Sequence, residues 1–210
     1  MNSLQPAQTM TDEDAMRADI YALLASLCRS HPSSELLHFL TSIELDSHAV
    51  NSMAKSWEFL RLAAERAEPQ AVEEEYCTLF IGITQGEITP FASWYLTGSL
   101  MEAPLIELRH DLELLGFSRQ DDVKEPEDHI AVLLEVMSEM IQQGASRERQ
   151  AVFYQRHIDA WAKQLFADMT QASSAVFYSA VGMLGEAFLT IESLNLQKRV
   201  DAVQSVHLRG

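Results

Sequence analysis

The stretch EPEDH at residues 125–129 places three carboxyl groups and an imidazole at the start of an apolar run. Such groups can transfer protons or bind a cationic partner. Pro126 also suits the first position of a helix, and acidic residues beside it complement the positive end of the helix dipole. The pattern therefore permits two interpretations, a functional site or the ordinary start of a helix from Pro126 to about Gln142.

His129 bears on the choice between them. On a helical wheel that begins at Pro126, it falls on the apolar face with Leu133 and Met137, whereas Asp128 lies on the polar face and is expected to be exposed. Desolvation and the helix N-terminus both disfavour a charged imidazole at such a position, unless a carboxylate lies near. A buried, fully hydrogen-bonded histidine is the structural explanation, and a role in binding or catalysis stays open.

The sequence lacks the familiar catalytic motifs: the phosphate-binding loop, HExxH, GxSxG and the dinucleotide fingerprint. GITQGEIT at residues 82–89 has the glycines of a loop but not the lysine of a phosphate site. No two of the seven histidines are spaced i, i+4 as a helical metal site needs. We therefore predict no catalytic residue, metal or cofactor. A nucleotide-binding or hydrolytic enzyme that uses Asp128 and His129 is the alternative.

The charge of the chain favours some partners over others. Its 15 basic and 31 acidic residues give a formal net charge of -16, so the basic footprint of a nucleic-acid binder is missing. A basic partner fits, and the field would speed its approach. No run approaches the ~18 apolar residues of a membrane span, and the N-terminus lacks the regions of an export signal. With Cys28 and Cys77 read as small buried side chains, these features predict a cytoplasmic protein.

The apolar spacing is helical almost throughout and predicts an all-α fold of roughly eight to ten helices. Thr11 is the expected N-cap of the first helix, which ends at Pro32. Ser33 or Ser34 is the expected cap of a second, shorter helix. A third is expected to begin at about Ser47 and to end before the next proline.

The middle of the chain is less regular. Residues 71–80, AVEEEYCTLF, are expected to form a helix whose three glutamates face water. Residues 81–95 contain two glycines and a proline but also three aromatic residues, so we expect an ordered loop that lies on the helices. Helical spacing resumes over residues 105–115, and Gly116 is placed to end that helix in a left-handed conformation.

The polar stretch at residues 118–127 is the expected hinge between two helical lobes, residues 1–117 and 128–210. In the second lobe we expect one long helix over residues 154–169 and another over residues 177–191. If the hinge straightens, the lobes can exchange between two copies, which predicts a monomer and a domain-swapped homodimer.

Three stretches together resemble the TorD/DmsD family of redox-enzyme maturation chaperones, and its TorD branch most closely. They are EEEYCTLF at residues 73–80, PFASWY at residues 90–95 and EPEDH at residues 125–129, and their order and spacing also match. The resemblance implies a cytoplasmic, all-helical chaperone that is not an enzyme. Its expected partners are an apo-molybdoenzyme, trimethylamine N-oxide reductase, and that enzyme's twin-arginine signal peptide. It would keep the apoenzyme competent for insertion of the molybdenum cofactor and delay export.

The resemblance also implies a partner-binding site in the three stretches and one upstream tyrosine. Carboxylates beside aromatic rings suit a pair of arginines, because guanidinium pairs bidentately with carboxylate and stacks on aromatic faces. Anchoring of a loop to the core is the alternative for the aromatics, and a general helical adaptor with a continuous apolar stripe is the alternative function. The implied site comprises Tyr21, Leu79, Phe80, Pro90, Phe91, Ser93, Trp94, Tyr95, Glu125, Pro126, Asp128 and His129.

Overall fold

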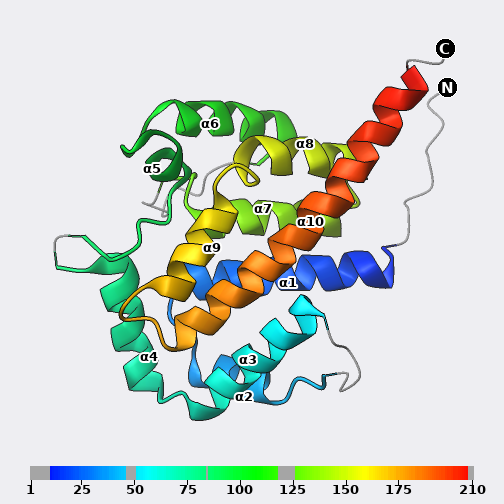
Figure 1. The fold of residues 1–210 in the computed structure, drawn as a ribbon. Helices are drawn as coiled ribbons and strands as arrows, with labels where there is room; N and C mark the ends of the chain where they lie inside the picture. The colour runs from blue at the N-terminus through cyan, green and yellow to red at the C-terminus, as the bar shows by residue number, and fades with distance from the viewer. Residues whose placement is uncertain (1–9, 46–50, 84, 118–125, 208–210) are drawn as a thin grey trace.

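The computed structural model describes residues 10–45, 51–83, 85–117 and 126–207. Within these ranges every regular element is a helix, and the only strand-like pairing is an isolated bridge between Phe91 and His129 (Figure 1). The predicted all-α fold is confirmed.

The first four helices begin largely where local signals place them. The side chains of Thr11, Ser33 and Asn51 accept hydrogen bonds from backbone N–H groups in the first turns of α1, α2 and α3. A proline opens the fourth helix instead, as expected at a first helical position. The bounds are α1 Asp12–Arg29, α2 Ser34–Thr41, α3 Ser52–Arg66 and α4 Pro69–Tyr76.

Shorter elements follow, and a long helix closes the fold. Gly116 ends α6 with a φ of 83°, as the sequence predicted. His207 ends α10, so this helix extends well past Ile191. The bounds are η1, a π-helical turn, Cys77–Ile81; α5 Ala92–Thr97; α6 Ala103–Leu115; α7 Ile130–Gln142; α8 Arg147–His157; α9 Ala162–Gln171; α10 Phe177–His207.

Several predicted boundaries are wrong. The helix expected over residues 71–80 becomes π-helical at Cys77, and the loop expected over residues 81–95 ends at Phe91, because α5 begins at Ala92. The long helix expected over residues 154–169 is broken at residues 158–161, where the indole N–H of Trp161 donates to the carbonyl of His157 at 2.7 Å and occupies an acceptor at the end of α8. Residues 46–50, which include the predicted start of α3, lie outside the described residues.

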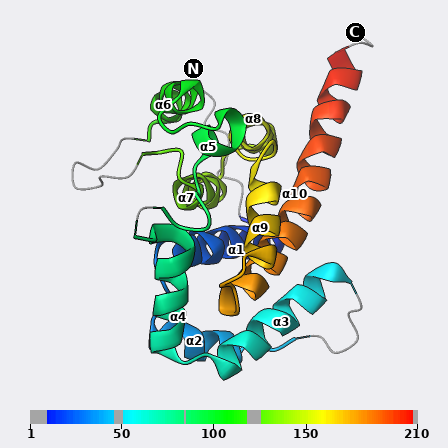
Figure 2. The same ribbon diagram turned by 60° about the vertical axis from the view of Figure 1, so that its left-hand side comes forward.

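One hydrophobic core runs through the described residues, from Ala18 to Leu196. α1 lies across the middle of the molecule and packs against α7, while α10 packs against α3, α8 and α9 (Figures 1 and 2). Helices from both predicted lobes thus contribute to the same core. Most of the predicted hinge, residues 118–125, lies outside the described residues, so the hinge and the lobe exchange stay predictions.

A buried ion pair crosses this core. Arg17 of α1 donates from Nε and Nη2 to the two carboxylate oxygens of Glu192 on α10, at 2.8 and 2.7 Å. Arg17 is 5% exposed and Glu192 1%. The Tyr21 hydroxyl donates to the same carboxylate at 3.0 Å, and Gln150 of α8 accepts from Arg17 at 3.1 Å. Since every charge here has hydrogen-bonding partners, burial of the pair is tolerated, and three helices are held in register.

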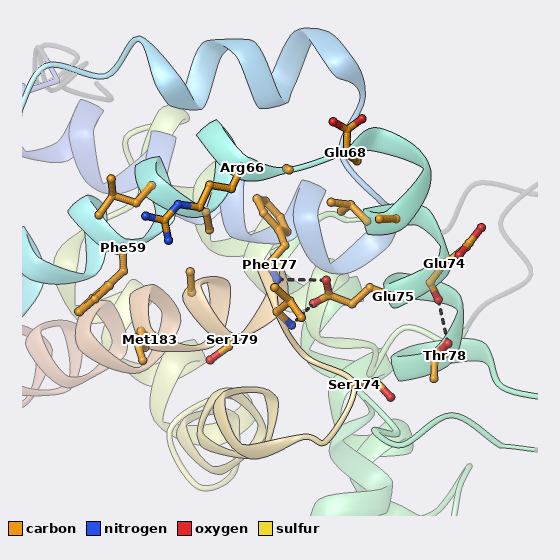
Figure 3. Close-up of a pocket in the computed structure, with 17 residues that line it drawn as sticks. Phe59, Arg66, Glu68, Glu74, Glu75, Thr78, Ser174, Phe177, Ser179 and Met183 are labelled. Carbon is orange, nitrogen blue, oxygen red and sulfur yellow. Dashed lines mark hydrogen bonds between the residues drawn. The ribbon is translucent and has the colours of Figure 1, made fainter.

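Glu75 corrects the expectation that all three glutamates of residues 71–80 face water. Its carboxylate reaches from α4 to the start of α10 (Figure 3). It accepts from the backbone N–H groups of Val176, Phe177 and Tyr178 at 2.8, 3.0 and 2.7 Å. These donors have no acceptor within their own helix, and a carboxylate also complements the helix dipole. Glu75 therefore caps α10 from a helix about a hundred residues earlier in the chain.

We expect Glu75→Ala to lower the free energy of unfolding by about 1–2 kcal/mol, because the start of α10 loses its acceptor. Its neighbour supplies a matched control: Glu74 is exposed, and Glu74→Ala should change stability by less than about 0.5 kcal/mol. Urea unfolding followed by circular dichroism measures both. Equal effects would show that the cap does not stabilise α10.

Candidate functional site

Two of the three stretches that carry the resemblance, PFASWY and EPEDH, lie side by side. Ala92 N donates to the carbonyl of Asp128 at 2.9 Å, and Ile130 N donates to the carbonyl of Pro90 at 2.9 Å. This antiparallel pairing joins PFASWY, at the entry of α5, to EPEDH, at the entry of α7. The rings of Phe91 and His129 meet edge to face, with their centroids 5.0 Å apart.

The sequence analysis expected Asp128 to be exposed. Its side chain is instead buried, with only 1% of the residue exposed. The wheel misplaced it because α7 begins at Ile130 and not at Pro126, so Asp128 is not part of the helix. Its Oδ2 accepts from the backbone N–H of Ser93 at 2.9 Å and from the Ser93 hydroxyl. The carboxylate thus caps α5, whose own N-cap, Phe91, supplies no side-chain acceptor.

His129 is the N-cap of α7 and is 5% exposed. Its Nδ1 accepts from the backbone N–H of Ala131 at 3.1 Å. Burial, aided by the positive charge of Arg29, lowers the pKa of His129 to about 4. The imidazole is therefore neutral near pH 7, and its proton is on Nε2 because Nδ1 accepts. Asp128 and His129 are each bonded to the start of a different helix, which is a structural arrangement and not that of a catalytic acid–base pair.

The aromatic residues of the predicted site divide between surface and core. Trp94 is 39% exposed, and Phe91 is partly buried. Tyr95 is also partly buried: its hydroxyl donates to Asp168 at 2.7 Å, and its ring packs on that of Trp161. Of these three aromatic residues, only Trp94 is therefore exposed enough to offer its ring to a partner.

The remaining predicted site residues occupy different environments. Tyr21, Leu79, Pro90 and Ser93 are buried, while Phe80 and Pro126 are partly buried. Glu125 lies outside the described residues. Among the described members of the predicted set, only Trp94 is therefore exposed, and the others are buried or partly buried.

Exposed apolar side chains that the sequence analysis missed lie on α5, in the turn after it and on α6. Together with Trp94 we call them the α5–α6 surface. The exposure of Ile106 could have been predicted from its spacing, because it does not lie on the helix face that carries the buried Leu105, Leu108 and Leu112. The α5–α6 surface comprises Trp94, Leu96, Leu100, Met101 and Ile106, which are 39%, 44%, 49%, 71% and 68% exposed.

A pocket of about 220 Å³ opens beside α5. Leu96 and Thr97 line it from α5, Glu107 from α6, and Arg156 and His157 from α8. Arg156 and His157 both bind Asp111, at 3.0 and 2.7 Å. The pocket thus combines apolar walls with Glu107, Arg156 and His157. Asp111 holds α6 and α8 together beneath it.

Other site types receive no support from the described residues. Among them, no group of three or more histidine, cysteine or acidic residues could hold a metal ion. None of their helices is long and apolar enough to cross a membrane. Cys28 is buried as predicted, but Cys77 is exposed. What the described residues define is an all-helical scaffold with an aromatic and apolar surface at one end, as in helical binding proteins.

Comparison with known proteins identifies the family. A profile described as nitrate reductase delta subunit matches residues 46–167, more than half of the chain, and the chain belongs to this family. The chaperone protein TorD of Shewanella piezotolerans is 26% identical over 202 residues, which cover 87% of this chain and 93% of that protein. TorD of Vibrio cholerae serotype O1 (strain M66-2) is 26% identical over 196 residues, covering 82% and 88%.

A solved structure shows the same fold. It is described as a candidate redox enzyme maturation protein of Archaeoglobus fulgidus, with a TM-score of 0.56, 16% identity, and coverage of 87% of this chain and 99% of that one. The predicted family of redox-enzyme maturation chaperones is confirmed. The similar sequences carry the names of chaperones, in agreement with the expectation that this protein is not an enzyme.

We expect Asp128→Ala to lower the free energy of unfolding by about 2 kcal/mol, because the first turn of α5 and the Ser93 hydroxyl lose a buried acceptor. Asp19→Ala, at an exposed position of α1, is the control and should change stability by less than about 0.5 kcal/mol. Thermal and urea unfolding measure the two effects. A wild-type stability for Asp128→Ala would show that this carboxylate is dispensable to the fold.

The depressed pKa of His129 makes stability pH-dependent in a defined direction. The unfolded imidazole takes up its proton near pH 6.5 and the folded one near pH 4. This contribution to stability is therefore complete above pH 6.5 and is lost as the pH falls toward 4. Between about pH 7.5 and about pH 5, wild type should lose about 2 kcal/mol more than His129→Asn, whose amide oxygen can still cap α7. Urea titrations at the two pH values measure the difference. His157, whose pKa is lowered mainly by burial, is present in both proteins, so its contribution to the pH dependence of stability cancels in the comparison.

Proposed function

We propose that this protein is a cytoplasmic maturation chaperone that binds the twin-arginine signal peptide and the apoprotein of a molybdoenzyme, trimethylamine N-oxide reductase. It keeps the client competent for insertion of the molybdenum cofactor and delays its export. The observation that carries the proposal is the pairing of PFASWY with EPEDH, which fixes α5 and presents Trp94 at the surface. The chaperone names of the TorD relatives support it.

The chemistry of the α5–α6 surface suits such a peptide. A twin-arginine peptide has two guanidinium groups followed by an apolar, helix-prone segment. Trp94 offers an aromatic face to a guanidinium, and Leu96, Met101 and Ile106 offer apolar area to the segment that follows. The net charge of -16 attracts the basic end of the peptide.

The structure changes which carboxylate could receive the arginines. Asp128 is buried and bonded to Ser93, so it acts by positioning α5. Glu127 binds Arg109 at 2.8 Å. Glu107 is exposed and lines the pocket beside Leu96, which makes it our candidate for the guanidinium contact.

One alternative function has a specific observation in its favour. The exposed apolar residues of α5 and α6 would also suit a general helical adaptor, for which apolar contact suffices. An adaptor would bind an apolar helix whether or not arginines precede it. The arginines of the peptide therefore distinguish the two functions.

We expect a twin-arginine peptide with its apolar segment to bind, and replacement of both arginines by alanine to weaken binding by about tenfold or more. Trp94→Ala and Glu107→Gln should each weaken the wild-type peptide severalfold. Phe39→Ala, which removes a 57% exposed aromatic ring on α2, should have no effect. Isothermal titration calorimetry measures all of these affinities. Equal affinity for the two peptides would favour the adaptor.

A further inference from the structure

A groove of about 620 Å³ lies between α3, α4 and the start of α10 (Figure 3). It shares no residue with the α5–α6 surface, and in both ribbon views the two regions lie toward opposite ends of the molecule (Figures 1 and 2). We call it the α3–α4–α10 groove and define it by Phe59, Ala63, Ala67, Ala71, Val176 and Met183.

The shape of this groove suits a helix. Ala63, Ala67 and Ala71 line it with small side chains, which allow close approach of a partner's backbone and side chains. Phe59 and Val176 stand at its edge and are 51% and 80% exposed. Apolar side chains exposed around a small-residue groove are the receiving half of helix-in-groove recognition, in which residues spaced i, i+3, i+4 and i+7 insert.

The charged residues around the groove favour some partner helices over others. Glu68 and Glu74 lie toward the α4 end, whereas Arg66 extends toward Phe59 (Figure 3). The start of α10, which would otherwise attract an anion, is occupied by the Glu75 carboxylate. The two exposed carboxylates thus favour a basic group at the α4 end of whatever lies in the groove.

We propose that the α3–α4–α10 groove binds a helical segment of the client apoprotein that has an apolar face and lysine or arginine at one end. The helix lays its apolar face against Phe59, Val176 and the alanines, and its basic end lies beside Glu68 and Glu74. This assignment of a client segment rests on the proposed function. It adds a second contact to the one at the α5–α6 surface.

The test uses a synthetic helix-forming peptide with leucines on one face and a pair of lysines at one end. Calorimetric titration of the full chain should show saturable binding. Phe59→Ser removes one wall and Ala71→Leu fills the groove, so each should weaken binding by about tenfold. Phe39→Ser, an equally exposed phenylalanine outside the groove, should bind like wild type. Replacing the lysines by glutamine, or Glu68 and Glu74 together by glutamine, should weaken binding severalfold at low salt and less at high salt.

The outcomes separate this inference from the proposed function. Absence of binding, or equal loss in Phe59→Ser and Phe39→Ser, overturns the groove assignment. So does a dimer that dissociates in Phe59→Ser, since the groove would then hold a second copy of the chain. The twin-arginine peptide is titrated in parallel: if Trp94→Ala weakens it and Phe59→Ser does not, the proposed function stands whatever the groove binds. If the helix binds the groove but the twin-arginine peptide binds nowhere, the proposed function fails while the groove remains a site for a basic, apolar helix.

Discussion

The backbone N–H groups at the start of each helix need acceptors, and the way this chain supplies them determines much of its architecture. Where the acceptor is local, as at Thr11 and Ser33, it only starts a helix. Where it comes from a distant segment, it also holds two elements together. Asp128 joins the segment before α7 to α5, and Glu75 joins α4 to α10. The described residues form no sheet, and such long-range caps fix the position of one element relative to another, as strand pairing does in other folds.

The EPEDH stretch illustrates how a motif rich in ionisable groups can act through position. Asp128 and His129 are buried, and each is bonded to the first turn of a different helix. The stretch therefore starts α7, and in doing so it holds α5 with Trp94 at the surface. A buried carboxylate costs free energy unless it is hydrogen-bonded, and here Ser93 in the first turn of α5 supplies the donors. Asp128 Oδ1 is buried without a hydrogen-bond partner among the described residues, so only Oδ2 caps α5.

The sequence predicted what depends on local signals and missed what depends on distant ones. The helical spacing, the caps Thr11 and Ser33 and the stop at Gly116 are encoded within a few residues, and the structure confirms them. The roles of Asp128 and Glu75 depend on partners 35 and about a hundred residues away, which no local pattern reveals. The break after α8 depends likewise on one buried side chain, because the indole N–H of Trp161 donates to the carbonyl of His157. The sequence predicted the burial of His129, but from a wheel that placed it inside the helix. Its capping role was missed because that depended on the exact residue at which α7 begins.

A chain of backbone and side-chain bonds connects the groove to the α5–α6 surface. Glu75 and Glu87 both bind the turn that leads into α10, through residues 173–178. The carbonyl of Leu79 accepts from Ile88 at 2.8 Å, and a Cβ at Gly86 would lie 2.4 Å from that carbonyl oxygen, so only glycine fits there. Two residues beyond Ile88, the chain pairs with Ile130 and enters α5. These bonds join the segments that carry the two surfaces. A client held at one surface would then meet the other at a high effective concentration, so that two weak contacts act together as a tighter one.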